Sequence, residues 1–195
     1  MLTLGFLSQK TVARLYCAIS DTGLGQRVGG VEALLLGVMQ MQGSRTNATG
    51  FVSVERSQFG LWEDDPFGEA DVQWLDLPLP EAVPGVALGA GAIKVRSSVR
   101  EHYAKVTVER ASEAVCPEGF ASLAQVPYRS RSGRVEVWTL FSGPTGVTLE
   151  IGGEGEEYIL HVFWASDPSK FENQAAPGVT RGAEEFHFVF VAAVA

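Results

Sequence analysis

Alternating apolar and polar residues mark the first clearly patterned part of the chain, between Phe51 and Trp62. In the sequence FVSVERSQ, Val52 and Val54 fall on one face of an extended strand, and Phe51 and Ser53 fall on the other. Successive side chains of a strand point to opposite faces, and β-branched and aromatic residues suit a pleated, half-buried surface. The pattern therefore predicts a β-strand that ends at Trp62.

The same alternation recurs along the rest of the chain, between turns rich in glycine and proline. Residues 92–110 predict a β-hairpin that turns near residues 97–100. The strand expected at 156–165 is nearly continuous in apolar residues, as in a strand buried on both faces. The expected last strand, 184–194, places Phe186, Phe188 and Phe190 on one face. Further strands are expected at 120–130, 132–141 and 147–151. Short strands at this spacing predict an all-β fold, an antiparallel β-sandwich.

Two segments lack the alternation. Residues 74–91 contain Pro78, Pro80 and Pro84, which cannot donate to a central ladder, so this segment is expected to be a connection or an edge. Residues 167–182 show no periodicity and predict a long loop, the kind of segment that often carries function.

Residues 1–49 differ from the rest, and we expect them to form an N-terminal extension to a β-sandwich domain at 50–195. Only the stretch 31–42, which stops before Gly43, resembles a short helix. Two interpretations stay open. Either the extension packs on the domain as a short accessory segment, or the natural start lies at Met39 or Met41.

Charge changes this picture by indicating the kind of partner. The chain of 195 residues has a net charge of −8, with four basic and two acidic residues in 1–50 against 11 basic and 21 acidic residues in the remainder. A surface this acidic is repelled by nucleic acid phosphates and by anionic lipid, so direct nucleic acid binding is not expected. A basic protein would be attracted instead.

The cysteines and the longest apolar run indicate in which cellular compartment the protein is expected. Cys17 and Cys116 are far apart and have no metal-like spacing, so a reducing cytoplasm is the default. The longest apolar run, 31–41, is about half of the roughly 20 residues that span a bilayer. We therefore expect neither a transmembrane segment nor a signal peptide. The protein would be cytoplasmic, or peripheral to the membrane through a partner.

A cluster of carboxylates follows the first predicted strand and is broken only by turn residues such as Pro66 and Gly68. One interpretation is a solvated acidic loop. The other is a surface that meets something basic, with the flanking tryptophans as apolar anchors, since tryptophan is enriched at the centres of interfaces. The candidate partner-binding residues are Trp62, Glu63, Asp64, Asp65, Glu69, Asp71 and Trp74.

The pattern offers little for catalysis. His161 and His187 could be neighbours on paired strands, but single histidines along strands are more often structural, so we expect no metal site and no cofactor. His102 lies beside a turn and is expected at the surface. The sequence has no Gly-x-Ser-x-Gly elbow, and Gly89-Ala90-Gly91 lacks the third glycine of a dinucleotide loop. We expect a protein that is not an enzyme.

Several short motifs, taken in order, resemble the competence protein J family. They are SVERSQFGLWED, VQWLDL, GAIKVRSS, YAKVTVER, AQVPYRSRSGRVEV and EYILHVFWA, and the resemblance covers about residues 50–195. It implies a small acidic β protein that inhibits a DNA-entry nuclease of competent bacteria, or an immunity-type partner of a nuclease toxin. The chain departs from the family in residues 1–49 and in the glycine-rich stretch 142–157, which leaves the partner open.

The charge pattern and the resemblance suggest the same hypothesis. A nuclease must present lysines and arginines to phosphate, and the acidic cluster would occupy that surface as a phosphate mimic. A second candidate surface is the 167–182 loop with Glu184 and Glu185. Two other classes of function stay open: a carbohydrate-binding or carbohydrate-active β-sandwich lined by tryptophan and tyrosine, and a structural subunit of a larger assembly. The oligomeric state is not predicted.

Overall fold

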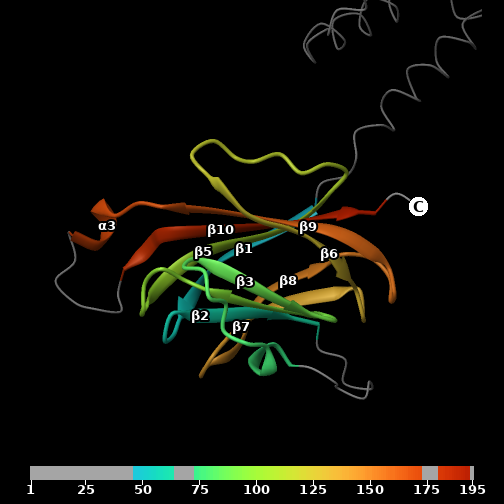
Figure 1. The fold of residues 1–195 in the computed structure, drawn as a ribbon, viewed down its shortest axis with the longest axis horizontal. Coiled ribbons are helices and arrows are strands. Elements are labelled where there is room, and N and C mark those ends of the chain that lie inside the picture. The colour runs from blue at the N-terminus through green and yellow to red at the C-terminus, as the bar shows by residue number, and fades with distance from the viewer. Residues whose placement is uncertain (1–45, 64–72, 173–179, 194–195) are drawn as a thin grey trace, which may run out of the picture. The chain divides into compact units, whose positions relative to one another are not determined.

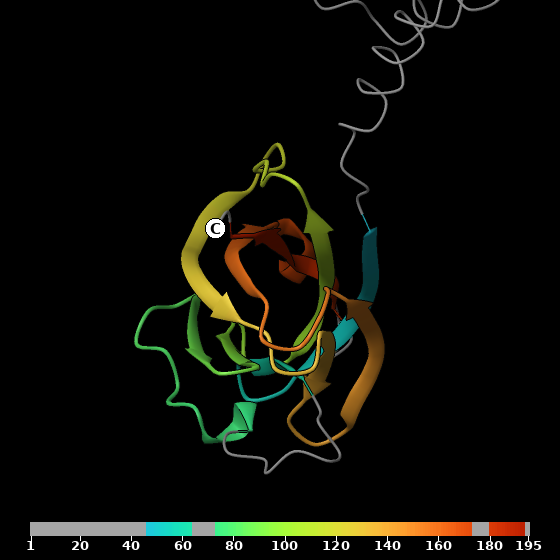
Figure 2. The ribbon, with the colours of Figure 1, turned by 90° about the vertical axis from the view of Figure 1, so that its right-hand side faces the viewer.

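The computed structural model describes residues 46–63, 73–172 and 180–193, which belong to one unit spanning 44–195. Two five-stranded sheets face each other, as Figures 1 and 2 show. Sheet A has the order β1-β5-β10-β9-β6, and sheet B has the order β3-β4-β2-β7-β8. The elements are β1 (Thr46–Val54), β2 (Gln58–Trp62), η1 (Trp74–Asp76), β3 (Gly85–Gly89), β4 (Ala92–Arg96), β5 (His102–Ala111), β6 (Ala121–Arg129), β7 (Arg134–Thr139), β8 (Gly143–Glu150), β9 (Glu157–Ser166), α3 (Ser169–Glu172) and β10 (Arg181–Ala192).

The predicted all-β sandwich is confirmed. Among the described strands, β10 pairs with β5 in parallel and the other pairs are antiparallel. The edge strands of the two sheets contact each other, β1 with β8 and β3 with β6. The short helix expected at 31–42 lies outside the described residues, and no described helix has the length and hydropathy to cross a bilayer.

The prediction of a single strand from Phe51 to Trp62 is wrong. The chain turns sharply between Glu55 and Gln58, whose backbone groups bond to each other at 3.1 and 3.2 Å, and passes from β1 in sheet A to β2 in sheet B. Arg56 and Ser57 at the turn have φ angles of 52° and 64°. Two successive positive φ angles are typical of a type I′ turn, which usually carries asparagine and glycine. The sequence lacks that signal, so the turn is invisible in the pattern.

The hairpin predicted over residues 92–110 is also wrong, although both of its strands exist. β4 pairs with β2 and β3 in sheet B, whereas β5 pairs with β1 and β10 in sheet A. Ile93 and Val95 of β4 and Val106 and Val108 of β5 all enter the same core. Two strands with one apolar face each can bury those faces by facing each other across a sandwich as well as by pairing edge to edge. Alternation alone does not distinguish the two arrangements.

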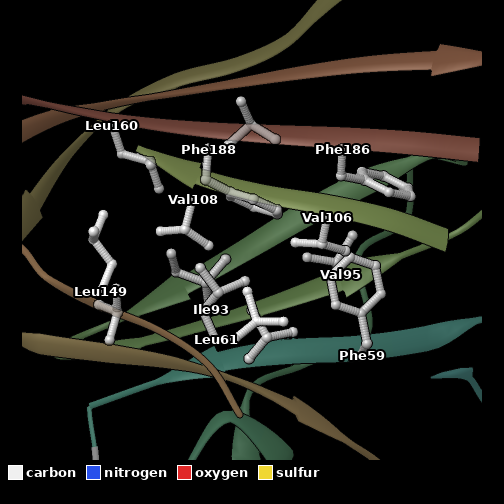
Figure 3. Packing of buried hydrophobic residues seen from close by; sticks show 14 of the residues in the cluster. Phe59, Leu61, Ile93, Val95, Val106, Val108, Leu149, Leu160, Phe186 and Phe188 are labelled. Atoms are coloured by element: carbon white, nitrogen blue, oxygen red, sulfur yellow. The ribbon is translucent and has the colours of Figure 1, made fainter. Parts of the chain in front are cut away.

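The core lies between the sheets and combines aliphatic side chains with aromatic rings such as those of Phe59, Phe186 and Phe188 (Figure 3). Phe186, Phe188 and Phe190 of β10 are at most 1% exposed, which confirms that they share one buried face. The ring of Phe59 from sheet B meets Phe186 edge to face, with 5.2 Å between centroids. Phe163 of β9 is buried on the opposite face of sheet A in a smaller cluster, so β9 is covered on both faces at that point.

The proline-containing segment before β3 is a connection that leads into an edge strand, as predicted. It begins with η1, and β3 pairs with β4 at the edge of sheet B. Figures 1 and 2 show η1 on the side of sheet B that faces away from sheet A. In the sequence, this segment follows the acidic residues 63–71.

Candidate partner-binding surface

Glu63 is not an exposed member of the acidic cluster, so that part of the prediction is wrong. The residue is 2% exposed and lies at the end of β2. Its carboxylate accepts hydrogen bonds from Tyr128 Oη at 2.5 Å, Ser130 Oγ at 3.0 Å and Ser132 Oγ at 3.2 Å. Three successive backbone N–H groups, of Arg131, Ser132 and Gly133, also donate to it, at 2.8, 2.6 and 3.1 Å. Converging backbone N–H groups form an anion-binding nest, and here the chain fills it with its own carboxylate.

The turn that holds Glu63 is itself held by the turn between β8 and β9. Gly133 O accepts from Ile151 N at 2.7 Å, and Ser130 N donates to Glu156 O at 2.9 Å. Gly133 has φ +83°, and a Cβ there would stand 2.0 Å from Gly152 O, so only glycine fits. Burial and the neighbouring carboxylate raise the pKa of Tyr128 well above its ordinary value, which keeps its hydroxyl as a donor to Glu63.

The two tryptophans beside the acidic cluster differ in their environment. Trp74 is 1% exposed, so the expectation that it serves as a surface anchor is wrong. Its indole lies over Gly60 of β2, where a Cβ would come within 2.3 Å of the ring, so glycine makes room for it. Trp62 is half-buried and meets the ring of Trp138 edge to face, with 5.0 Å between centroids. Of the two, Trp62 keeps surface that a partner can reach.

Asp64, Asp65, Glu69 and Asp71 lie outside the described residues. Glu63 directly precedes this stretch and is held in its nest, and Gln73 N donates to Asp76 Oδ2 at 3.1 Å at the start of η1. In the sequence, no lysine, arginine or histidine occurs between Arg56 and Lys94. After the carboxylates at 64–71, the sequence contains further acidic residues and no basic residue before Lys94 of β4.

Two cations of β4 fasten the segment from Trp74 to Pro84 to sheet B, and the sequence pattern did not reveal them. Lys94 Nζ donates to the carbonyl oxygens of Leu75, at 2.7 Å, and of Leu77. Arg96 Nη1 donates to the carbonyl oxygens of Pro80 at 2.9 Å and Glu81 at 3.3 Å. Lys94 is only 6% exposed, and this burial lowers its pKa against the opposing effect of Asp76. Both cationic side chains therefore lie under the segment and donate hydrogen bonds to its backbone.

A second buried polar cluster lies at the opposite end of the β4 strand, where the chain crosses from sheet B to sheet A. Glu184 accepts from Ser97 Oγ, from Ser98 Oγ at 2.5 Å and from Trp164 Nε1 at 3.1 Å. His102 Nε2 lies 3.1 Å from the same carboxylate, and both side chains have 0% exposure. The prediction that His102 is at the surface is wrong, and so is the use of Glu184 in the second candidate surface.

The hydrogen bonds to Glu184 decide its charge state. Burial alone would raise the pKa of Glu184, but the nearby His102 and the hydroxyl groups of Ser97 and Ser98 outweigh burial and lower it to about 2. The cluster is therefore an internal clamp between the β4–β5 crossover and β10. Glu185, the other residue of the second candidate surface, points outward and pairs with Lys105 at 2.9 Å.

The remaining histidines lie on the outer face of sheet A. His161 and His187 are on paired strands, as expected, and each contacts Phe163. His187 Nε2 lies 2.8 Å from Glu109 Oε2, while burial lowers the pKa of His161. Within residues 46–63, 73–172 and 180–193, no group of three metal-ligating side chains comes together.

We predict that Glu63→Gln lowers the free energy of unfolding by about 3 kcal/mol, because an amide NH₂ would face donors in a buried nest. Chemical denaturation measures this loss. Glu150→Gln is the matched control: Glu150 is exposed and pairs with Arg134 at 3.6 Å, so its loss should stay below about 1 kcal/mol. Equal, small losses for both variants would show that the nest does not hold the turns.

The low pKa of Glu184 predicts an acid-dependent stability. The folded pKa, about 2, lies below the ordinary 4.5, so the carboxylate stabilises the fold above pH 4.5, and this contribution is lost as pH falls toward 2. Glu184→Gln should cost about 3 kcal/mol at pH 7 and little at pH 2. Glu185→Gln, on a surface pair, should cost less than about 1 kcal/mol. A Glu184→Gln loss that is independent of pH would contradict the assignment.

No protein-family model matches this chain, and no curated protein matches it. Two solved structures are similar to it at low sequence identity. One is described as ComJ, inhibitor of the DNA degrading activity of NucA, from Bacillus subtilis, with 14% identity and a TM-score of 0.48 over 77% of this chain and 98% of ComJ. The other is described as crocagin biosynthetic gene J, with 12% identity and a TM-score of 0.45 over 77% of this chain and 99% of its own.

Proposed function

We propose that this chain is a non-enzymatic protein-binding module that inhibits a nuclease by covering its basic DNA-binding surface. The observation that carries the proposal is the stretch between Arg56 and Lys94, residues 57–93, which contains carboxylates and no basic residue. Within it, Asp64, Asp65, Glu69 and Asp71 lie between the buried Glu63 and the start of η1. Asp76 and Glu81 continue the acidic stretch as exposed side chains.

Electrostatics explains how such a stretch would inhibit. A nuclease presents lysine and arginine to the phosphates of DNA, and a protein that offers carboxylates to the same groups competes with DNA for them. Complementary charge also steers association, which raises the rate of encounter at low salt. Glu63 is excluded from the contact because its oxygens are occupied inside the protein. ComJ is named as an inhibitor of a nuclease, and we propose the same class of activity here on the charges of this chain.

The described structure does not favour the carbohydrate hypothesis. A sugar-binding groove needs exposed aromatic faces, but Trp74 is buried and Trp138 packs on Trp62. Trp164 packs against the core and donates its N–H to Glu184. The indoles of Trp74 and Trp164 therefore serve the fold, whereas Trp62 and Trp138 are half-buried.

The test is inhibition of DNA degradation by nuclease from the source organism, using the fraction that heparin retains. The parent chain should inhibit this activity, and a variant with Asp64→Asn, Asp65→Asn, Glu69→Gln and Asp71→Asn should need about tenfold or more protein for the same effect. The dependence of its inhibition on salt should also be weaker, because fewer charges take part.

A charge-matched control separates the acidic stretch from net charge. Glu101→Gln, Glu113→Gln, Glu118→Gln and Glu154→Gln remove four exposed carboxylates elsewhere. This variant should inhibit nearly as well as the parent. If both quadruple variants lose inhibition equally, net charge alone is responsible. If the parent leaves the nuclease fully active at every concentration, the proposed function is wrong.

A further inference from the structure

The segment from Trp74 to Pro84 exposes three large apolar side chains. Leu75, Leu79 and Val83 are 43%, 46% and 52% exposed, whereas Trp74 and Leu77 are at most 8% exposed. The inward side chains pack on sheet B with Ala92. The outward ones therefore do not belong to the core, and they recur at every fourth position of one short segment.

This segment is held in place by its backbone. Lys94 and Arg96 bond to carbonyl oxygens along its length, from Leu75 to Glu81. Pro78, Pro80 and Pro84 further restrict its φ angles. A surface that is already ordered loses little conformational entropy when a partner binds it. Exposed leucine and valine on a fixed backbone are thus well placed to contribute to affinity.

The charges on this segment indicate the partner. Asp76 and Glu81 are exposed on it, the carboxylates of residues 64–71 precede it, and the two cations beneath it are bonded to its carbonyl groups. Interfaces commonly have an apolar centre and a polar, charged rim. The surface fits a partner whose apolar side chains are surrounded by lysine and arginine.

We infer that Leu75, Leu79 and Val83 form the apolar part of the docking surface for a basic protein, together with the exposed carboxylates of Asp76 and Glu81 on the same segment. The inference rests on the proposed function and adds to it. The nuclease's basic surface must carry apolar side chains next to its lysines and arginines. Because Trp74 is buried, we assign the anchoring role expected for it to the exposed side chains of Leu75, Leu79 and Val83.

The test compares two triple variants in the heparin-retained nuclease assay. Leu75→Ser, Leu79→Ser and Val83→Ser should raise the amount of protein needed for half inhibition by about 10- to 100-fold, because apolar area no longer leaves water on binding. The control, Phe51→Ser, Val115→Ser and Phe141→Ser, removes three side chains that are 52%, 54% and 68% exposed elsewhere. It should inhibit as the parent does. Both variants should melt within a few degrees of the parent, since all six side chains are exposed.

A single substitution, Leu79→Arg, serves if the triple variant fails to fold. It should weaken inhibition more than Leu79→Ser, because a new positive charge would face a basic partner.

The possible outcomes separate this inference from the proposed function. Full inhibition by the Leu75, Leu79 and Val83 variant, with inhibition lost in the acidic quadruple variant, overturns this inference and leaves the proposed function standing. A parent chain that does not inhibit overturns both. Sedimentation supplies the third outcome: a dimeric parent and a monomeric triple variant with unchanged inhibition would make a second copy of this chain the occupant.

Discussion

The buried carboxylate of Glu63 is the interaction on which the arrangement of this end of the protein depends. An ionised group loses its hydration when it is buried, and this cost is offset only where several donors replace the water. Glu63 receives them from Tyr128 and from the turn of residues 130–133. Residues 130–133 also form backbone hydrogen bonds with the connection between β8 and β9. One side chain thereby joins the end of β2 to the turn between β6 and β7 and, through it, to the turn between β8 and β9. The acidic stretch of the sequence begins at this residue.

In the segment from Trp74 to Pro84, the acidic side chains are exposed, whereas the basic side chains that contact the segment lie beneath it. Lys94 and Arg96 lie beneath the segment from Trp74 to Pro84 and bond to its carbonyl groups, while Asp76 and Glu81 are exposed on it. Their hydrogen bonds to the carbonyl oxygens fix the backbone of this segment. Leu75, Leu79 and Val83 are exposed on the same segment, so apolar and acidic side chains occur on it together.

The sequence predicted most of the strands and the fold class, because a strand with one buried face shows alternating apolar and polar residues in the sequence. It failed where partners far apart in the sequence decide the outcome. The turn at Arg56 and Ser57 has neither glycine nor asparagine, so two strands looked like one. Glu63 could not be distinguished from Asp64, because its donors come from a turn 67 to 70 residues away. His102 and Glu184, 3.1 Å apart, likewise gave no local sign of their pairing.

The central claim is that a basic nuclease docks on the acidic stretch and the apolar segment that follows it. Hydrogen–deuterium exchange of this chain, alone and with the nuclease fraction retained by heparin, tests that claim most directly. The account predicts slower exchange in peptides that cover residues 64–84, with little change in peptides from the connection between β5 and β6. Protection confined to that connection, or to β6 and the turn between β8 and β9, would contradict it.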